Sequence, residues 1–500
     1  MPRELTRRCV LLAVLSTKTA VAVPGVTAAS VGTPQSEGGI GGWPMFGHNA
    51  ANTRHAPDET APTTGVREHW RFQTGARVWS IPAVVDGTVF VGSDDTHVYA
   101  LDAVSGDEQW RFQTGDTVWS SPAVVDDTLF VGSNDNYLYA LDAASGEEEW
   151  RFQTGDAVVS SPAVVDGTVF VLSWDDNVYA LDAASGDEPW RFRTEEHGGW
   201  SSPAVVDGTV FVGSNDTHVY ALDAASGDER WRFRTDDVVG PSPAVVDGTV
   251  YVSSYDSRVY ALDAASGDER WRFQTDDDVH SSPAVGNGTV FVGSIDSHVY
   301  ALDAASGDER WRFRTDADVT SSPAVVDGTV FVGSNDTHVY ALDAVSGDEQ
   351  WRFQTDKAVQ SSPAVVDGTV FVGSDDYSMY ALTGADRERT HTPTPSATAS
   401  SIPPPSTSNE NGFRLVQLGA LGTVGTVVGF LISNAENEHV KGNALALIAA
   451  LLGGGGLLRL VLERGSGVSL LVIALALGVF LGILVGIIFR KRGFTISSSE

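Results

Sequence analysis

The stretch YALDAASGDERWRF, found at Tyr220–Phe233, Tyr260–Phe273 and Tyr300–Phe313, places aspartates, a glutamate and an arginine within a few residues of one another. Carboxylates so close together are the groups that acid–base catalysis or cation binding requires. The stretch occurs three times without a change, however, and near copies of it occur elsewhere in the chain. Because catalysis needs one distinctive site, this repetition favours a structural role for the acids.

The same repetition predicts the elements that carry these residues. The triplet Trp-Arg-Phe recurs at a spacing of 40 residues, with one step of 41, and begins at Trp70, Trp110, Trp150, Trp190, Trp231, Trp271, Trp311 and Trp351. Between two tryptophans, SPAVV is typical of a strand and DG of a hairpin turn, while TVFVGS, VYALDA and WRFQT are typical of three further strands. Four short antiparallel strands in about 40 residues are typical of a propeller blade.

The order of these strands predicts how the ring closes. The first Trp-Arg-Phe strand precedes the first three-strand unit, and the last unit, Ser361–Leu382, has no such strand after it. We therefore expect Glu68–Thr74 to be the outer strand of the blade that begins at Ser361, which leaves no free sheet edge. The sequence predicts an all-β, eight-bladed β-propeller over residues 65–385, with four-stranded antiparallel blades and an N-terminal strand that closes the last blade.

The repeats also contain the pattern AxDxxSGDxxW, as in Ala261, Asp263, Ser266, Gly267, Asp268 and Trp271. This pattern resembles the tryptophan-docking repeat of the quinoprotein (PQQ-type) β-propellers, which include PQQ-dependent dehydrogenases and non-enzymatic scaffolds such as the assembly lipoprotein BamB. The lead-in Gly41–Pro57 is similar to the segment before such repeats in haloarchaeal proteins. The resemblance implies that the eight repeated tryptophans are structural docking residues. It specifies no function, because the motif belongs to the scaffold.

The charge of the chain indicates its medium. The net charge is −33, from 65 acidic and 32 basic residues. Such a surface suits molar salt, where the screening length falls to about 3 Å, and we expect the source to be an extreme halophile, an archaeon. The alternative is a surface that binds calcium or a cationic partner. Nucleic acid is excluded as a partner because it requires a basic surface.

The N-terminal region reads as an export signal over residues 1–30, followed by a lead-in over residues 31–64. Arginines precede the short apolar run CVLLAVLS, which resembles a twin-arginine signal, and a general secretory signal is the alternative. The single cysteine, Cys9, lies in this signal. We expect the propeller to be exported.

The C-terminal region predicts a membrane anchor. Residues 386–412 are rich in Pro, Ser and Thr and indicate a stalk. Transmembrane helices are expected at 413–433, 443–462 and 468–489, each about 20 residues long. The second contains Arg459 and is the weakest of the three. The basic tail at 490–500 is expected in the cytoplasm, which places the propeller outside the cell.

The blades differ mainly on the face that carries the connections between blades. We therefore expect the binding face to comprise Trp79, Trp119, Trp174, Trp200, Tyr255 and His280. Exposed aromatic rings around a channel mouth suit a flat ligand, a sugar or a protein partner. The alternative is that these rings pack under the lead-in or fill the channel. Sequons for N-glycosylation occur at Asn215, Asn287 and Asn335.

These features favour a membrane-anchored, non-enzymatic propeller at the cell surface, acting as an interaction or assembly scaffold for a surface or membrane protein, or as a module that binds a small ligand. The alternative is a PQQ-dependent dehydrogenase of alcohols or sugars. The resemblance implies that such an enzyme has adjacent cysteines and inserted calcium ligands, whereas this propeller has no cysteine. A third alternative makes the propeller accessory to an activity of the membrane segments. We assign no catalytic or metal-binding residue and expect no cofactor, with PQQ and calcium belonging to the alternative alone.

Overall fold

The computed structural model describes residues 42–195 and 198–385. The predicted export signal, the first part of the lead-in, the stalk, the three predicted spans and the basic tail lie outside the described residues. Within the described part of the chain, no helix is long and apolar enough to cross a membrane.

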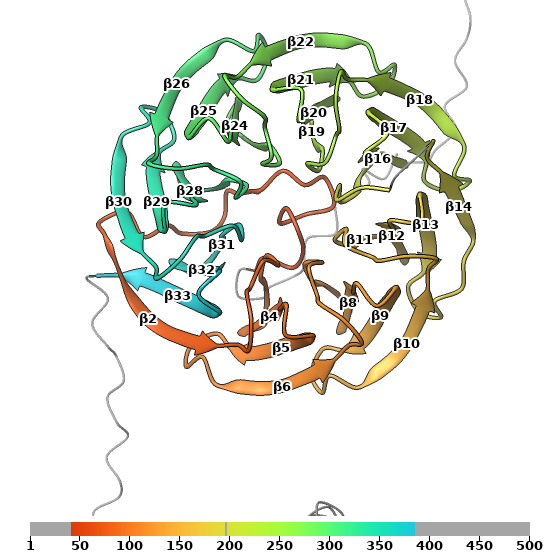
Figure 1. Ribbon diagram of the computed structural model, residues 1–500, viewed down its shortest axis with the longest axis horizontal. Helices are drawn as coiled ribbons and strands as arrows, with labels where there is room; N and C mark the ends of the chain where they lie inside the picture. Colours follow the sequence, from red (N-terminus) through yellow and green to blue (C-terminus); the bar gives the residue numbers. More distant parts are fainter. Residues whose placement is uncertain (1–41, 196–197, 386–500) are drawn as a thin grey trace, which may run out of the picture. The chain divides into compact units, whose positions relative to one another are not determined.

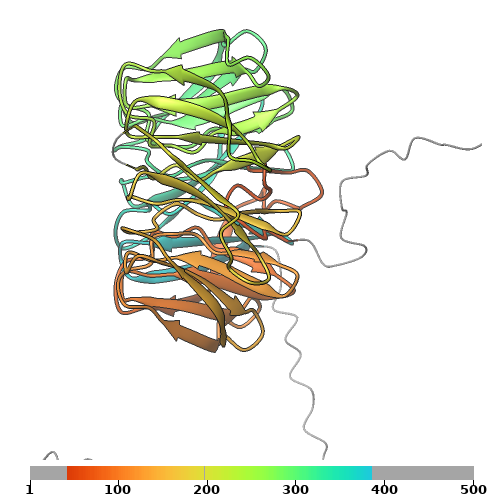
Figure 2. The same ribbon diagram turned by 90° about the vertical axis from the view of Figure 1, so that its right-hand side faces the viewer.

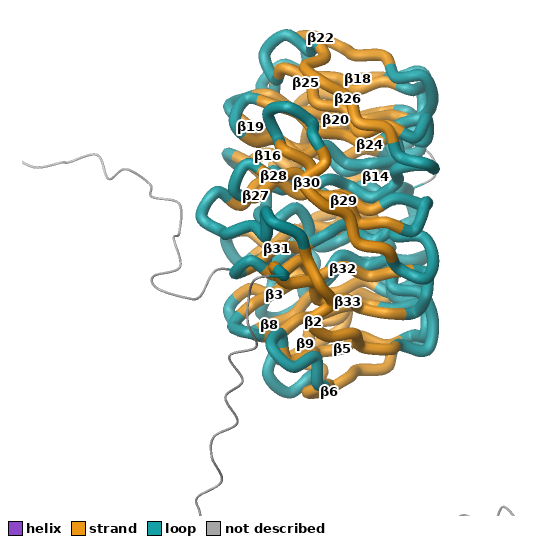
Figure 3. Tube along the Cα trace, turned by 90° about the vertical axis from the view of Figure 1, so that its left-hand side faces the viewer, coloured by secondary structure: helices purple, strands orange, loops and turns teal. Residues whose placement is uncertain are grey.

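Eight antiparallel sheets are arranged around a central axis (Figure 1), which confirms the predicted eight-bladed β-propeller. Each sheet is a blade of four strands that run in order from the axis to the rim. One blade has an additional short strand, β1 (His55–Ala56), which pairs in parallel with β27 at the axis. Seen from the side, the blades form a disc with loops on both faces (Figures 2 and 3).

The strands at each of the four positions are similar in length and sequence. The innermost strands are β3 (Ala83–Val85), β7 (Ala123–Val125), β11 (Ala163–Val165), β15 (Ala204–Val206), β19 (Ala244–Val246), β23 (Ala284–Gly286), β27 (Ala324–Val326) and β31 (Ala364–Val366). The second strands are β4 (Thr88–Gly92), β8 (Thr128–Gly132), β12 (Thr168–Leu172), β16 (Thr209–Gly213), β20 (Thr249–Ser254), β24 (Thr289–Gly293), β28 (Thr329–Gly333) and β32 (Thr369–Ser374). The third strands are β5 (His97–Asp102), β9 (Tyr137–Asp142), β13 (Asn177–Asp182), β17 (His218–Asp223), β21 (Arg258–Asp263), β25 (His298–Asp303), β29 (His338–Asp343) and β33 (Ser378–Gly384). The outer strands are β6 (Glu108–Gln113), β10 (Glu148–Gln153), β14 (Trp190–Arg193), β18 (Glu229–Arg234), β22 (Glu269–Gln274), β26 (Glu309–Arg314), β30 (Glu349–Gln354) and β2 (Val66–Gln73).

Burial explains why the middle strands are apolar throughout. In the first blade, residues Val89–Gly92 of β4 and Val98–Leu101 of β5 are all buried. Each blade packs between two others, so both of its faces are covered and no polar alternation is needed. The outer strand β6 instead alternates, with Trp110 buried and Arg111 exposed, because one of its faces meets solvent.

The turns between the first two strands follow the predicted Asp-Gly chemistry. Asp86 and Gly87 both have positive φ, at 48° and 76°. This conformation gives a two-residue hairpin whose twist matches that of the strands. These turns lie on one face of the disc. On the other face, the loop between the second and third strands contacts the connection between blades. In the first blade, the Asp94 amide in this loop donates a hydrogen bond to Arg77 O in the connection at 2.9 Å.

The ring closes through strand β2. This N-terminal strand pairs antiparallel with β33, with Trp70 opposite Ala381 and Phe72 opposite Met379. The last blade therefore consists of β31, β32, β33 and β2. This is the closure that the sequence predicts, and it joins the two ends of the propeller by main-chain hydrogen bonds.

The repeated tryptophans connect neighbouring blades. The Trp271 indole Nε1 donates to Ala304 O of the next blade at 3.0 Å, and its ring lies against Gly307. A Cβ on Gly307 would lie 2.7 Å from that ring, so only glycine fits there. Trp351 differs, because the last blade lacks the SGD turn, and its Nε1 donates instead to Pro62 O at 2.6 Å.

The described lead-in closes one end of the central channel. Its main chain hydrogen-bonds to the middle residue of six innermost strands, in the pairs Trp43–Val84, Pro44–Val124, Ala50–Val205, Ala51–Val245, Thr53–Val285 and Arg54–Val325. Figure 1 shows this segment winding inside the ring. The lead-in plug thus provides hydrogen-bond partners for main-chain groups of the innermost strands that would otherwise face the channel unpaired.

Candidate ligand-binding channel

The open end of the central channel forms a cavity of about 330 Å³ with Phe46 of the lead-in among its lining residues. Its wall includes one residue from each blade, at the position just before the innermost strand: Trp79, Trp119, Val159, Trp200, Gly240, His280, Thr320 and Gln360. These positions are about 40 residues apart in the chain and meet only because the ring closes. Of the six residues predicted for the binding face, the structure places Trp79, Trp119, Trp200, Tyr255 and His280 in this wall.

Four indoles gather on one side of the mouth. Trp119 and Trp200 are stacked, with ring centroids 5.0 Å apart and planes 17° apart. Trp79 lies 5.4 Å from Trp119. Trp174, the sixth predicted residue, supports the cluster from behind, with its ring edge-on to Trp200 at 5.3 Å. Trp200 is 40% exposed, so it presents a free aromatic surface at the mouth.

A second aromatic pair comes from the neighbouring blades. The rings of Tyr255 and His280 are stacked at 4.1 Å and 11°. A Cβ on Gly240 would lie 2.7 Å from Tyr255 Oη, so glycine at this position makes room for the tyrosine. Burial lowers the pKa of His280 and so favours the neutral imidazole.

Two carboxylates orient the indoles of the mouth. Trp119 Nε1 donates to Asp94 Oδ1 at 2.6 Å, and Asp94 Oδ2 also accepts from Arg77 Nε at 3.0 Å. Trp79 Nε1 donates to Asp375 Oδ1 at 2.7 Å, and burial raises the pKa of that carboxyl. Charge-assisted hydrogen bonds of this length fix the plane of each indole.

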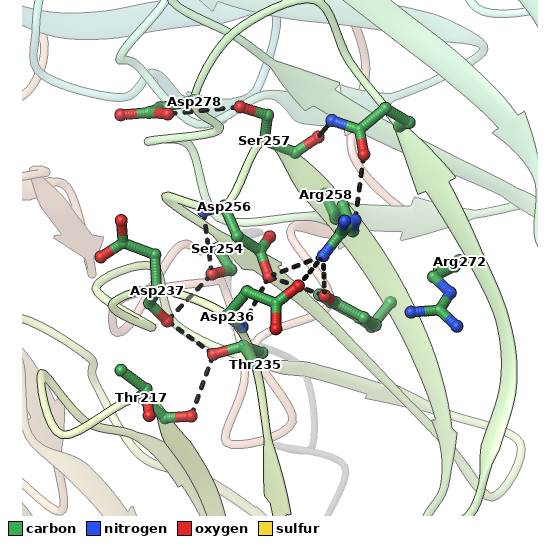
Figure 4. A network of polar contacts seen from close by, with 12 residues as sticks. Thr217, Thr235, Asp236, Asp237, Ser254, Asp256, Ser257, Arg258, Arg272 and Asp278 are labelled. Carbon is green, nitrogen blue, oxygen red and sulfur yellow. Dashed lines mark hydrogen bonds and ion pairs between the residues drawn. The ribbon is translucent and has the colours of Figure 1, made fainter.

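Polar contacts also brace the loop that carries Tyr255 (Figure 4). Arg258 Nη1 donates to Asp236 Oδ2 at 2.5 Å and lies 3.6 Å from Asp256 Oδ2. Tyr260 Oη donates to Asp256 Oδ2 at 2.6 Å, and the Asp256 amide donates to Ser254 Oγ. These hydrogen bonds and the ion pair therefore fix the conformation of the loop that positions the Tyr255 ring.

A ring of serine hydroxyls lies in the same wall, and sequence reasoning did not single it out. Each Oγ accepts the main-chain N–H of the equivalent residue one blade earlier, as Ser242 accepts from Ser202 at 2.8 Å. The ring comprises Ser121, Ser161, Ser202, Ser242, Ser282, Ser322 and Ser362. Among the described residues none of these seven hydroxyls donates a hydrogen bond, so each proton can be donated to a ligand. The signal was the second serine of the repeated SSP, which only Ile81 interrupts.

The acids of YALDAASGDERWRF lie on the opposite face and form no site. Asp263 Oδ1 accepts the amides of Ala265 and Ser266 at 3.0 Å, and its Oδ2 accepts from Arg270 at 2.8 Å. The Arg270 hydrogen bond, together with these amides, lowers the pKa of Asp263 to about 2. The carboxylate thus caps a turn and neutralises an arginine at the surface.

This pKa shift predicts a weak pH dependence of stability. The folded pKa lies below the ordinary value of 3.8, so the stabilisation is present above about pH 4 and is lost as the pH falls through about 2. We expect the triple variant Asp223→Asn, Asp263→Asn, Asp303→Asn to melt at a lower temperature than wild type at pH 6 and at an equal temperature near pH 2. The matched control is the triple variant Asp228→Asn, Asp268→Asn, Asp308→Asn. The carboxylates of these three residues accept hydrogen bonds from serine hydroxyls and form no ion pair with an arginine among the described residues. If both triple variants lower the melting temperature equally at pH 6, the hydrogen bonds from the arginines to the aspartates do not contribute to stability.

Comparison with known proteins identifies the family. A family model described as outer membrane protein assembly factor BamB matches residues 61–119, 113–232, 175–294, 215–320, 259–358 and 296–411, which is more than half of the chain. The chain belongs to the BamB family. No curated protein sequence gave a significant match.

Solved structures share the fold of this BamB-family propeller at low identity. BamB from Moraxella catarrhalis is 19% identical with a TM-score of 0.55, over 64% of this chain and 99% of that one. A europium-containing methanol dehydrogenase is 15% identical with a TM-score of 0.60, over 69% and 98%. Quinohemoprotein alcohol dehydrogenase from Comamonas testosteroni is 16% identical with a TM-score of 0.60, over 77% and 85%. Because scaffolds and enzymes both appear, these likenesses show the fold alone.

The channel of this BamB-family chain does not fit a quinone cofactor. Pyrroloquinoline quinone is a tricarboxylate and needs cationic partners, yet none of the described lining residues is Lys or Arg. Burial lowers the pKa of the His280 imidazole, which disfavours its cationic form. Within the described residues, no three His, Cys, Asp or Glu side chains converge to hold a metal ion.

The three predicted sequons lie in different settings. Asn287 is exposed in a hairpin turn, with φ of 51°. Asn215 and Asn335 lie in loops on the channel-mouth face, and the Oδ1 atom of each is buried. Of the three, Asn287 is the most accessible to modification.

Proposed function

We propose that this chain is a non-enzymatic binding module whose propeller takes an uncharged sugar ring into the mouth of its central channel. The observation that carries the proposal is a single wall that combines stacked indoles with a ring of free hydroxyl protons and, among the described residues, no charged side chain. The cavity of about 330 Å³ is large enough for a monosaccharide and its hydration.

The chemistry of the wall matches a sugar on two counts. A pyranose has an apolar face of C–H groups, which packs on an aromatic ring such as the exposed Trp200. Its hydroxyls need hydrogen-bond partners of both kinds, and serine hydroxyls provide them. An anionic ligand would meet no cation in this wall.

The setting of the module is part of the same proposal. The acidic surface supports work in molar salt, where an uncharged recognition site loses nothing to screening. The apolar segments after residue 412 support a membrane anchor, with the propeller outside the cell. There the module would bind surface glycans, or a glycosylated surface or membrane protein.

Removal of one indole tests the site. We expect Trp200→Ala to weaken binding of neutral sugars about tenfold or more, because the stacking surface is lost. The measurement is isothermal titration calorimetry in molar KCl against a panel of neutral mono- and disaccharides. The matched control is Tyr377→Ala, since Tyr377 is an equally exposed aromatic (40%) outside the wall.

Three outcomes would contradict the proposal. One is that no sugar in the panel binds the wild-type chain. Another is that Tyr377→Ala weakens binding as much as Trp200→Ala. The third is dye reduction with alcohols or sugars after addition of PQQ and calcium, which would establish the dehydrogenase instead. Charge reversal on the opposite face, as in Asp268→Lys, should leave sugar binding unchanged.

A further inference from the structure

Arg54 is a buried basic residue of the plug, the lead-in segment that closes the channel. Its side chain is fully buried in the plug, with 0% exposure. None of its three guanidinium nitrogens, Nε, Nη1 and Nη2, has a hydrogen-bond acceptor among the described residues. No described carboxylate forms an ion pair with it. A buried charge in this state is strongly unfavourable unless something compensates it.

The one group that faces the guanidinium cannot satisfy its N–H donors. The Phe46 ring centroid lies 4.2 Å from Arg54 Cζ. An aromatic face attracts a cation but offers no lone pair to five N–H bonds. Burial lowers the pKa of Arg54 to about 9, so the group is still charged at pH 7.

Other donors in the plug are also unpaired. Trp43 Nε1 is buried without an acceptor, and His48 Nδ1 is buried without a hydrogen-bond partner of either kind. The Trp43 and His48 rings are in edge contact, with centroids 5.0 Å apart. The plug thus contains buried N–H groups of Arg54 and Trp43 that have no acceptor among the described residues, and an anion can supply one to the guanidinium.

We infer that the plug encloses one small monovalent anion, chloride, bound by the guanidinium of Arg54. Chloride is the class of anion that fits, because the site has a single positive charge and is closed to solvent. The anion would enter as the lead-in folds onto the ring, so its binding adds to the stability of the folded state. It would also hold Phe46, which contacts the Arg54 guanidinium and lines the ligand channel.

Anion-specific stability tests the site on the full-length chain. We expect the unfolding temperature of the wild type to be about 3–5 °C higher in sodium chloride or bromide than in sodium gluconate at equal ionic strength. In Arg54→Met this difference should vanish, because the apolar side chain needs no counter-ion. In the control Arg193→Met it should persist, since the Arg193 side chain is 72% exposed.

Crystals grown in bromide give an independent readout. We expect an anomalous peak within hydrogen-bond distance of the Arg54 nitrogens in the wild type, a result that holds even if Arg54→Met fails to fold. The inference is overturned if that position holds only water. It is also overturned if Arg54→Met keeps the chloride-over-gluconate difference, or is more stable than wild type by the same margin in every salt.

Discussion

Replacing Trp271 with alanine is expected to lower the free energy of unfolding by about 3–5 kcal/mol. The indole is 8% exposed and packs 5.9 Å from the Tyr251 ring of its own blade. Its Nε1 also donates to Ala304 O in the next blade. The variant therefore leaves a cavity at the junction of two blades and removes one of the two side-chain hydrogen bonds that Ala304 O accepts, the other coming from Tyr251 Oη at 3.1 Å. Thermal or urea unfolding of the wild type and the variant in molar salt measures the loss.

A glycine pair separates this contact from backbone strain. Gly307 and Gly248 have similar positive φ, at 78° and 69°. A Cβ at Gly307 would lie 2.7 Å from the Trp271 ring, whereas a Cβ at Gly248 would meet nothing within 4 Å. Both alanine variants carry the conformational cost of about 1 kcal/mol, and Gly307→Ala should cost clearly more. Equal losses at the two positions would show that the tryptophan contact contributes little.

Removal of strand β2 is expected to abolish the cooperative unfolding transition. A chain that begins at residue 75 leaves β33 as a free edge, since β2 pairs with it from Val66 to Gln73. It also removes Trp70, whose ring packs in the core between the last blade and the first. Open edges and uncovered apolar surface favour association, so we expect oligomers by light scattering and a broad thermal transition.

A permuted chain provides the matched control. It also begins at residue 75, but it carries Val66–Gln73 after β33 through an SGDE turn like those of the other blades. Both chains lack the lead-in plug, so the comparison isolates the closing strand. We expect the permuted chain to be monomeric and to unfold cooperatively. If the chain without β2 is itself a cooperative monomer, the closure is not what holds the ring together.

Much of the fold could be predicted because its signals are local. The Asp-Gly turns need positive φ, and Asp86 and Gly87 have it. The strand lengths follow from the turns, and the unmatched strand at Trp70 predicts the pairing with β33. The part of the site that could be predicted is the set of blade positions that differ, since invariant positions serve the scaffold.

The rest of the site could not be predicted because it depends on distances across the ring. The period of 40 residues shows that Trp119 and Trp200 occupy the same position in two blades, but it does not show that their rings stack. The repeated serines resemble ordinary turn residues until the ring brings Ser202 and Ser242 into contact. The reason for glycine at position 240 is seen only in the structure, where a Cβ would clash with the Tyr255 side chain.

By itself, therefore, the sequence determined the blade number, the mode of closure and the face on which the blades differ. These follow from period, turn chemistry and the count of strands. Only the tertiary structure decided that the lead-in plugs the channel, that the serines form a ring and that Arg54 is buried without a partner. The lead-in has no copy of itself in the chain, so no periodicity reveals its place. Its conformation is set by the unpaired N–H groups of the innermost strands.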